Sequence, residues 1–327
     1  MIENRISAQE ANQRADKYVR KFLNNAPLSF IYRLFRKKDV KVAGHWINID
    51  YILREGDVLR MYVTDAQLAE LAKPRKVVRV PDLSSIVFED DNILIANKSK
   101  GLLVHGDETE KAYTLANQVI NYLVQKGEYD QQLTKGFTPA PAHRLDRNTS
   151  GLVVFAKNLP ALQELEAMFK DRRGIDKHYL ALVVGRVSHD QIIDFPLKKD
   201  ARAKLVKVDK VQNGALEAIT EIKVLKYYGS YTLLDVHLLT GRTHQIRVHL
   251  KAISHPVVGD GKYGDFADNR FFKEQFNYDS QFLHAYKVIF EGNQGLLSYL
   301  NGKQFICSLP KKETQILDCL TSKEISQ

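Results

Sequence analysis

The chain has 327 residues, of which 44% are hydrophobic and 27% charged, an ordinary composition for a globular protein. This length exceeds the size at which a single hydrophobic core stops growing, so we expect one large domain and one smaller domain. The formal net charge of +9 favours a polyanionic partner, and the lack of a long apolar stretch or of an apolar N-terminal signal argues against a membrane or exported protein, so we expect a cytoplasmic location.

The positive charge is concentrated near the N-terminus. Residues 1–63 contain twelve Lys and Arg against seven Asp and Glu, so more than half of the excess lies in less than a fifth of the chain. Apolar side chains at helical spacing predict a first helix over about 15–23, which ends before Pro27. Ser29 can cap a second short helix that is apolar on one side. Its other side carries the cations Arg33, Arg36 and Lys37.

Short strands follow the two helices. We expect them at three places: 40–42, 46–47 and 58–63. Two helices and a small sheet make a small α/β domain over residues 1–63. Residues 64–82 lose periodicity and combine charge with proline, which is typical of a linker.

Residues 83–327 are predicted to form a larger α+β domain. Apolar runs predict strands at 151–157, 178–184, 219–226 and 231–239. Helical spacing predicts helices at about 112–126, 160–171 and 243–253. Because these elements do not alternate regularly, we expect a mixed, mainly antiparallel sheet instead of a parallel one.

The most informative segment is His-Arg-Leu-Asp-Arg-Asn-Thr-Ser-Gly at 143–151, which leads directly into an apolar strand. Asp146 lies between Arg144 and Arg147 in this segment. Nearby cations favour the charged form of a carboxyl group, so we expect an ionised Asp146 that can act as a nucleophile or a base. Taken alone, the same pattern also fits a surface ion pair at a strand edge.

Two later segments carry further candidates. Tyr179 lies at the start of the predicted strand 178–184, where its ring can form part of a binding face or simply pack in the core. Arg247 lies on the predicted helix 243–253, on the side opposite its apolar face. A guanidinium anchored in this way can bind a carboxylate and fix both its charge and its orientation.

Cysteines and histidines give no sign of a metal site or of a cofactor. Cys307 and Cys319 are spaced unlike a zinc site or a redox pair, so we expect two reduced, structural thiols. His244 and His249 are five residues apart and have no evident co-ligand. The glycine-rich loop 259–264 lacks the Gly-Lys-Ser/Thr ending of a nucleotide-binding loop.

Taken together, these motifs resemble the RluA family of pseudouridine synthases over nearly the whole chain. The family signature His-Arg-Leu-Asp-Arg-x-Thr-Ser-Gly stands at 143–151. The partner motifs follow the family order: Asn97-Lys98, Lys177-x-Tyr179, Gly241 to His249, Gly259-Asp260 and Leu283-His284-Ala285. Within the family the chain looks most like the RluC branch, which modifies large-subunit ribosomal RNA. It departs from the usual pattern at Ser99-Lys100, where Pro-Ser is common.

The resemblance implies an isomerase that converts uridine to pseudouridine without a cofactor or a metal ion. It makes Asp146 the essential carboxylate and Arg247 its ion-pair partner. Tyr179 is then stacked on the target uracil, and Arg144 fills the gap that a flipped uridine leaves. The sequence does not decide whether the carboxylate attacks the sugar or removes a proton from it.

Residues 1–63 resemble the S4 RNA-binding domain, although Ala43-Gly44 stands where the family usually has Asn-Gly. This resemblance implies that cationic side chains contact phosphates, which positions RNA without reading its sequence. The candidate contacts are Arg14, Arg33, Arg36, Lys37 and Lys38. The expected partner is therefore RNA, most simply large-subunit (23S) ribosomal RNA.

Three other interpretations of the function remain open. The chain could be a non-catalytic RNA- or ribosome-binding protein, or a pseudouridine synthase that acts on transfer RNA. It could also be a glycoside- or nucleoside-cleaving hydrolase, although such enzymes usually employ two carboxylates and no second acidic residue stands out beside Asp146. No coiled-coil pattern indicates self-association, so we expect a monomer.

Overall fold

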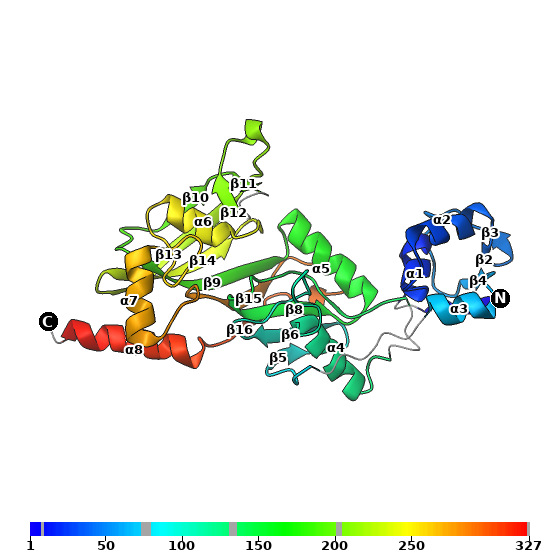
Figure 1. Cartoon of the computed structure of the whole chain (residues 1–327), viewed down its shortest axis with the longest axis horizontal. Helices are drawn as coiled ribbons and strands as arrows, with labels where there is room; N and C mark the ends of the chain where they lie inside the picture. The colour runs from blue at the N-terminus through cyan, green and yellow to red at the C-terminus, as the bar shows by residue number, and fades with distance from the viewer. Residues whose placement is uncertain (8–9, 73–79, 131–135, 201–204, 326–327) are drawn as a thin grey trace.

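The computed structural model describes residues 1–7, 10–72, 80–130, 136–200 and 205–325. Its N-terminal unit contains a four-stranded antiparallel sheet in the order β1-β4-β2-β3 (Figure 1). The strands are β1 (Ile2–Arg5), β2 (Val40–Val42), β3 (His45–Trp46) and β4 (Val58–Met61). Helices α1 (Ala15–Phe22) and α2 (Leu28–Arg36) share one hydrophobic core with this sheet.

Helix α2 confirms the predicted apolar and cationic sides, but the prediction of its cap is wrong. Phe30, Ile31, Leu34 and Phe35 are buried along one side of the helix. Pro27 is the N-cap residue, in an extended conformation at φ −65° and ψ 149°, and no side chain caps the helix. Because proline fixes φ near this value, the helix begins at Leu28, and Ser29 lies inside its first turn.

The range predicted as a linker contains a helix, α3 (Asp65–Leu71). A capping box starts it: the Thr64 hydroxyl accepts a hydrogen bond from the Gln67 amide, and the Gln67 side chain accepts one from the Thr64 amide. Leu68 and Leu71 pack against the N-terminal core. Residues 73–79 of the predicted linker lie outside the described residues. The predicted domain boundaries stay a prediction.

The larger unit is built on a ten-stranded sheet with the main strand order β10-β13-β14-β9-β15-β8-β6-β5. Among the described residues, every pair of strands in this sheet is antiparallel except β15 with β8, which confirms the expected α+β class with a mainly antiparallel sheet. The strands are β5 (Ile86–Glu89), β6 (Ile93–Lys98), β7 (Ala140–Pro141), β8 (Ser150–Ala156), β9 (Ile175–Val184), β10 (Gln191–Asp194), β13 (Ile219–Tyr228), β14 (Tyr231–Leu238), β15 (Leu283–Phe290) and β16 (Gln304–Ile306).

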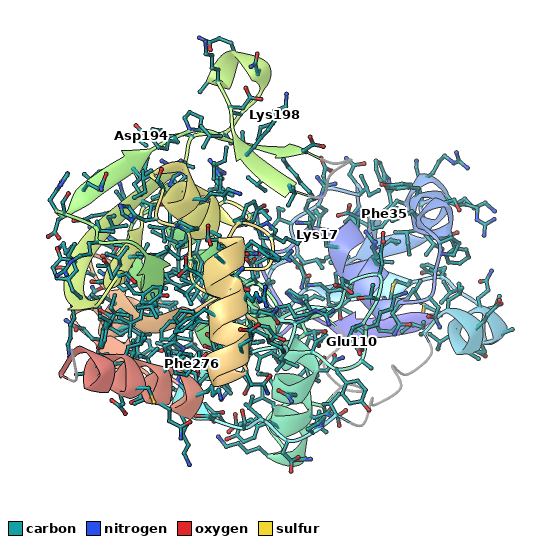
Figure 2. The ribbon with its side chains drawn as sticks, turned by 60° about the vertical axis from the view of Figure 1, so that its left-hand side comes forward. Lys17, Phe35, Glu110, Asp194, Lys198 and Phe276 are labelled. Atoms are coloured by element: carbon teal, nitrogen blue, oxygen red, sulfur yellow. The ribbon has the colours of Figure 1, made fainter. Side chains whose placement is uncertain are left out.

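A separate pair of strands and five helices complete this unit. Strands β11 (Leu197–Asp200) and β12 (Leu205–Val208) pair with each other and stand away from the large sheet, with Lys198 on β11 (Figure 2). The helices are α4 (Leu115–Gln125), α5 (Leu159–Asp171), α6 (Gln245–Ala252), α7 (Phe266–Phe276) and α8 (Lys311–Ile325). Among the described residues, none of the helices combines the length and the apolar character needed to span a lipid bilayer.

Strand β8 lies inside the sheet, between β15 and β6, and is buried along its whole length. Val153 and Phe155 face the core on the α4 side, whereas Leu152 and Val154 face the core on the α5 side. Gly151 has φ +112°, and a Cβ atom there would lie 2.2 Å from the Ala285 carbonyl oxygen. Only glycine therefore permits the close parallel contact with β15 that fixes the start of β8.

The two units meet at Gly136, which precedes β7 in the larger unit. The Gly136 amide donates a hydrogen bond of 2.7 Å to Glu10 Oε1. Its carbonyl oxygen accepts from Gln13 Nε2 at 3.2 Å and from Lys21 Nζ at 2.9 Å. Glu10 and Gln13 are both buried. These contacts place α1 beside the α5 end of the larger unit (Figure 1).

Candidate active site

Asp146 lies in the short loop between β7 and β8, and a buried lysine holds this loop in place. The Asp146 carbonyl oxygen accepts a hydrogen bond from the Thr149 amide at 3.0 Å, which closes a turn. Lys98 Nζ donates to the carbonyl oxygens of Ser99, Leu102 and Arg147 at 2.8 to 3.0 Å. Burial lowers the Lys98 pKa to about 7, although the negative charge of Asp146 acts to raise it. The Lys98 side chain thus joins the loop after β6 to the loop that carries Asp146.

The ion-pair partner of Asp146 comes from α6, a hundred residues further along the chain. Arg247 Nη1 donates to Asp146 Oδ2 at 2.8 Å. The Arg247 side chain is only 6% exposed, whereas that of Asp146 is 25% exposed. The pair therefore presents its carboxylate to solvent and keeps its guanidinium inside, an arrangement that leaves Asp146 free to meet a substrate.

A second carboxylate, Asp260, holds Arg247 from the other side. Arg247 Nε and Nη2 donate to the two oxygens of Asp260 at 2.6 and 2.7 Å. The Asp260 side chain is fully buried, and its Oδ1 also accepts the amides of Lys262 and Tyr263. Burial opposes a charge on Arg247, but the bonds to Asp260 and the charge of Asp146 keep the Arg247 pKa above its usual value. The guanidinium is thereby fixed in charge and in orientation.

Asp260 was not among the predicted site residues. The sequence contained a signal for it, the glycine-flanked Gly259-Asp260-Gly261, but no local pattern connected that loop with Arg247. The helix prediction also placed Arg247 on an outward face, whereas in the structure both faces of α6 are buried. Loop 259–264 covers the Arg247 side of the helix, because Asp260 and the Tyr263 ring both contact the guanidinium.

His244 adds an oriented imidazole to the site. Its Nε2 lies 3.8 Å from Asp146 Oδ2, and its Nδ1 lies 2.9 Å from the Tyr263 hydroxyl. That hydroxyl accepts a hydrogen bond from the Val206 amide, so its own proton is available for His244 Nδ1. Burial lowers the His244 pKa, with the charge of Asp146 acting in the opposite direction. The neutral ring then carries its proton on Nε2, facing the carboxylate.

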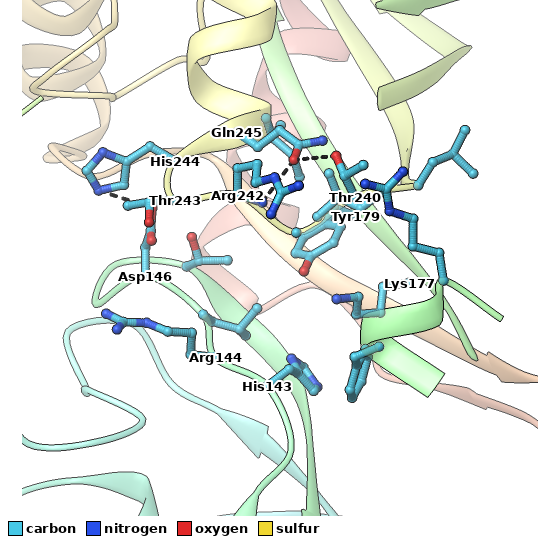
Figure 3. Close-up of a pocket in the computed structure, with 18 of the residues that line it drawn as sticks. His143, Arg144, Asp146, Lys177, Tyr179, Thr240, Arg242, Thr243, His244 and Gln245 are labelled. Carbon is cyan, nitrogen blue, oxygen red and sulfur yellow. Dashed lines mark hydrogen bonds and ion pairs between the residues drawn. The ribbon is translucent and has the colours of Figure 1, made fainter. Parts of the chain in front are cut away.

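A pocket of about 460 Å³ opens beside Asp146, and Figure 3 shows its lining residues. Tyr179 and Lys177 reach it from β9, and His143 and Arg144 reach it from the loop before β8. Tyr179 is only 4% exposed, and burial together with the charge of Asp146 raises its pKa. Tyr179 therefore remains a neutral phenol whose ring forms a wall of the pocket. The volume lies in the range of pockets that bind small molecules.

The two arginines next to Asp146 in the sequence do not pair with it. Arg144 is exposed and lines the pocket. Arg147 turns away and contacts Asp107 at 3.6 Å and the Thr109 hydroxyl at 3.3 Å. Asp146 is thus next to a cation, as expected, but this cation is Arg247, which is distant in the sequence, and not Arg144 or Arg147.

The five predicted phosphate contacts of the S4-like segment lie on the N-terminal unit, which stands beside the unit with the large sheet (Figure 1). Arg14 pairs with Asp16 at 3.0 Å, and the Arg33 guanidinium lies 4.9 Å from the Phe30 ring centre. Lys38 Nζ lies 4.6 Å from the centre of the Trp46 ring. Arg36 and Lys37 are exposed near the end of α2.

Both cysteines are free thiols, as expected, but only one of them is buried in the structure. Cys307 is buried, and burial raises its pKa to about 12. Cys319 is exposed on α8, because its position on the helix faces solvent, so it is not a structural thiol. The part of the chain that the structure describes contains no cluster of three or more His, Cys, Asp or Glu side chains that could hold a metal ion.

A partly exposed carboxylate bound to a buried guanidinium, beside a pocket of small-molecule size, is typical of enzymes that use a carboxylate in catalysis. The family model described as RNA pseudouridylate synthase matches residues 92–252. Ribosomal large subunit pseudouridine synthase C of Vibrio parahaemolyticus is 34% identical over 88% of this chain and 87% of its own length. The protein of the same name from Escherichia coli K12 is 35% identical over 86% and 85%. The chain belongs to the RNA pseudouridylate synthase family.

A solved structure supports the fold assignment. The human protein described as RNA pseudouridylate synthase domain containing 4 superposes with a TM-score of 0.57. It is 23% identical in sequence, and the match covers 72% of this chain and 92% of that one. The larger mixed sheet is therefore the fold of the pseudouridylate synthases.

Proposed function

We propose that this chain converts specific uridines of large-subunit (23S) ribosomal RNA to pseudouridine, with Asp146 as the essential carboxylate. The observation that carries the proposal is the array of Asp146, Arg247 and Asp260 at the edge of the pocket that contains Tyr179. The choice of RNA follows the relatives, which are named for the large ribosomal subunit. Transfer RNA is the alternative substrate.

The isomerisation of uridine to pseudouridine requires a carboxylate but no electron donor and no phosphoryl donor. The bond between N1 of the base and C1′ of the ribose breaks, the base turns, and C5 joins C1′. The proton lost from C5 is balanced by one gained at N1. Asp146 has two routes to start this sequence: attack on C1′, or removal of the proton from C2′. Both require an ionised carboxylate with access to the ribose.

Each neighbour of Asp146 has a role in this scheme. Arg247 keeps the carboxylate charged and oriented, and its own geometry is set by Asp260. A uridine in stacked RNA must first be flipped out, which costs a few kcal/mol. Stacking on the neutral Tyr179 ring returns roughly 1 to 3 kcal/mol. Arg144, exposed at the pocket rim, is placed to occupy the gap that the uridine leaves.

The N-terminal unit supplies the sequence-independent part of RNA binding in this proposal. Its candidate phosphate contacts are Arg14, Arg33, Arg36, Lys37 and Lys38, and we place the boundary of this S4-like domain near residue 72, after α3. We take a monomer as the working state, because the sequence contains no coiled-coil pattern that indicates self-association. A ribosomal RNA substrate places the enzyme in the cytoplasm.

A nucleoside-cleaving hydrolase is disfavoured by the state of the second carboxylate. Such an enzyme needs an acid that protonates the leaving group. Asp260 is the second carboxylate that binds Arg247, but its side chain is fully buried and both its oxygens bind the guanidinium. It therefore cannot reach a substrate in the pocket.

Mapping modified positions tests the proposal directly. The purified protein is incubated with unmodified large-subunit RNA, small-subunit RNA and transfer RNA, and pseudouridines are located by carbodiimide-dependent stops of reverse transcription. We expect new stops in the large-subunit RNA alone. Stops confined to transfer RNA would move the assignment to that substrate. Free uracil in place of pseudouridine would favour the hydrolase.

A further inference from the structure

The outer face of the N-terminal sheet carries exposed aromatic and cationic side chains. Strand register places Glu3 beside Arg60, Arg60 beside Lys41, and Lys41 beside Trp46 in one row across the four strands. Tyr62, two residues after Arg60, follows on the same face. Trp46 is 51% exposed and Tyr62 is 42% exposed. The apolar neighbours of these residues in β2 and β4 point inward and are buried. The Trp46 and Tyr62 rings on the outer face therefore take no part in the hydrophobic core.

Ammonium groups lie over both rings. Lys38 Nζ is 4.6 Å from the Trp46 ring centre, and Lys41 Nζ is 5.0 Å from the Tyr62 ring centre. The one carboxylate in the row, Glu3, is already bound to Arg60 at 2.7 Å. Within the part of the chain that the structure describes, Lys38 and Lys41 form no ion pair with a carboxylate. This face therefore combines flat apolar surface with uncompensated positive charge.

Lys38 holds this position at a conformational cost. It is the residue after the cap of α2 and has φ 62°, in the left-handed region. Its amide donates to the Phe35 carbonyl, and the Asp39 amide donates to the Leu34 carbonyl, which together form a Schellman motif. Glycine usually occupies this place because a side chain is strained there. Lys38 therefore carries a backbone strain that glycine would not have.

We propose that Trp46, Tyr62, Lys38 and Lys41 form a stacking platform for unpaired bases of the RNA substrate, separate from the catalytic pocket. This inference rests on the proposed function, and it adds a binding element that the predicted phosphate contacts do not include. Bases stack on the two rings, and the lysines that lie over the rings in the free protein turn to the adjoining phosphates. Sequence-tolerant stacking flanked by cations is the common mode of single-strand binding.

The position of the platform decides which part of an RNA it meets. Strands β2 and β3 lie on the side of the N-terminal unit that faces away from the large sheet (Figure 1). A helix of paired RNA offers phosphates to such a face but hides its bases, so the exposed rings favour a single-stranded segment or a loop. The platform therefore engages RNA at a distance from the flipped uridine.

Trp46 is the single tryptophan of the chain, so its fluorescence reports on the platform alone. The full-length protein is titrated with oligoadenylate, which contains no uridine and gives the catalytic site no substrate. Heparin serves as a polyanion without bases. We expect saturable quenching by oligoadenylate and little quenching by heparin. Equal quenching by both, or none by oligoadenylate at concentrations where a labelled oligomer binds, would overturn the stacking proposal.

Variants separate binding from folding. Lys38→Gly removes the ammonium and relieves the strained backbone, so we expect an unchanged or higher Tm with weaker binding of labelled oligoadenylate. Trp46→Ala should weaken this binding roughly 5- to 150-fold, the loss of one stacked base, and Trp46→Phe should recover part of it. Lys312→Ala, an exposed lysine on α8 in the other unit, is the matched control.

The outcomes separate this proposal from the proposed function. Unchanged affinity in Lys38→Gly and Trp46→Ala, with both proteins folded, would overturn the platform while leaving pseudouridine formation untouched. Loss of affinity in the Lys312→Ala control to the same extent would show a general charge effect and would also overturn it. If the protein modifies no RNA but oligoadenylate still quenches Trp46, the proposed function fails and the platform stands as an RNA-binding surface.

Discussion

At the scale of single residues, the arginine beside Asp146 is held more firmly than the aspartate itself. Arg247 makes two bonds to the buried Asp260 and one to the half-buried Asp146. This asymmetry leaves Asp146, the proposed reacting carboxylate, able to adjust to a substrate while its counter-ion stays fixed. Preorganised charge of this kind is worth more in a dry site than in water, since no reorganisation is needed during the reaction.

Asp260→Asn tests this positioning role. Asparagine keeps the shape but removes the charge and offers one oxygen, so Arg247 loses a charge-assisted bond. We expect kcat for pseudouridine formation to fall about tenfold to a hundredfold, with RNA affinity within a few fold of wild type. The control is Asp268→Asn, which alters a carboxylate on α7 that accepts a hydrogen bond from the Tyr231 hydroxyl, and it should leave kcat unchanged. A normal kcat in Asp260→Asn would refute the role.

At the scale of elements, the C-terminal helix is connected to the loop that carries Asp146. Glu313 on α8 pairs with Lys100 at 2.6 Å, and both side chains are largely buried. Lys100 also donates to the Gln281 carbonyl oxygen, and the Gln281 side chain donates to the Thr149 hydroxyl at 3.3 Å. Lys100 is the position where this chain departs from the usual family pattern. Its partner on α8 explains how a lysine is accommodated in that loop.

Removing one side of this buried pair should be costly. In Glu313→Gln the Lys100 ammonium is left without its counter-ion, so we expect the free energy of unfolding to fall by about 3–5 kcal/mol. The double variant Lys100→Met with Glu313→Leu removes both charges and should recover most of this loss. Denaturant unfolding monitored by circular dichroism measures both. A Glu313→Gln variant as stable as wild type would contradict the proposed connection.

Local patterns in the sequence predicted many elements but not their long-range partners. The predicted strands at 151–157 and 219–226 correspond to β8 and β13, because alternation and apolar runs are local properties. Helices α7 and α8 were not predicted. Phe272 is the one fully buried residue of α7, so its apolar stripe is weak. The parallel contact of Gly151 with Ala285 and the clamp of Asp260 on Arg247 join distant segments, which no periodicity reveals.

At the scale of the whole molecule, the two units are joined by polar contacts around a glycine. A Cβ atom on Gly136 would lie 2.6 Å from both Glu10 Oε1 and Tyr18 Cε2. Tyr18 is 1% exposed and cannot move aside. The close approach at Gly136 therefore sets the spacing between the N-terminal unit and the pocket beside Asp146. Under the proposed function, this fixed spacing lets the two units bind one RNA with a high effective concentration.

Gly136→Ala should uncouple the units without destroying either. The clash pushes α1 away from the loop before β7, so we expect KM for long ribosomal RNA to rise several-fold, whereas kcat stays near the wild-type value. A short stem-loop that reaches only the pocket should show no change in KM, and it serves as the internal control. Equal effects on the long and the short RNA would contradict the proposed coupling.

The central claim is that Asp146 performs the chemistry, and replacing it with asparagine under single-turnover conditions tests this most directly. Asparagine fills the same volume but carries no charge to attack C1′ or to remove the C2′ proton. With the mapped large-subunit RNA, we expect Asp146→Asn to form no detectable pseudouridine while its Kd for that RNA stays within a few fold of wild type. Pseudouridine formation at a rate near that of wild type would contradict the account.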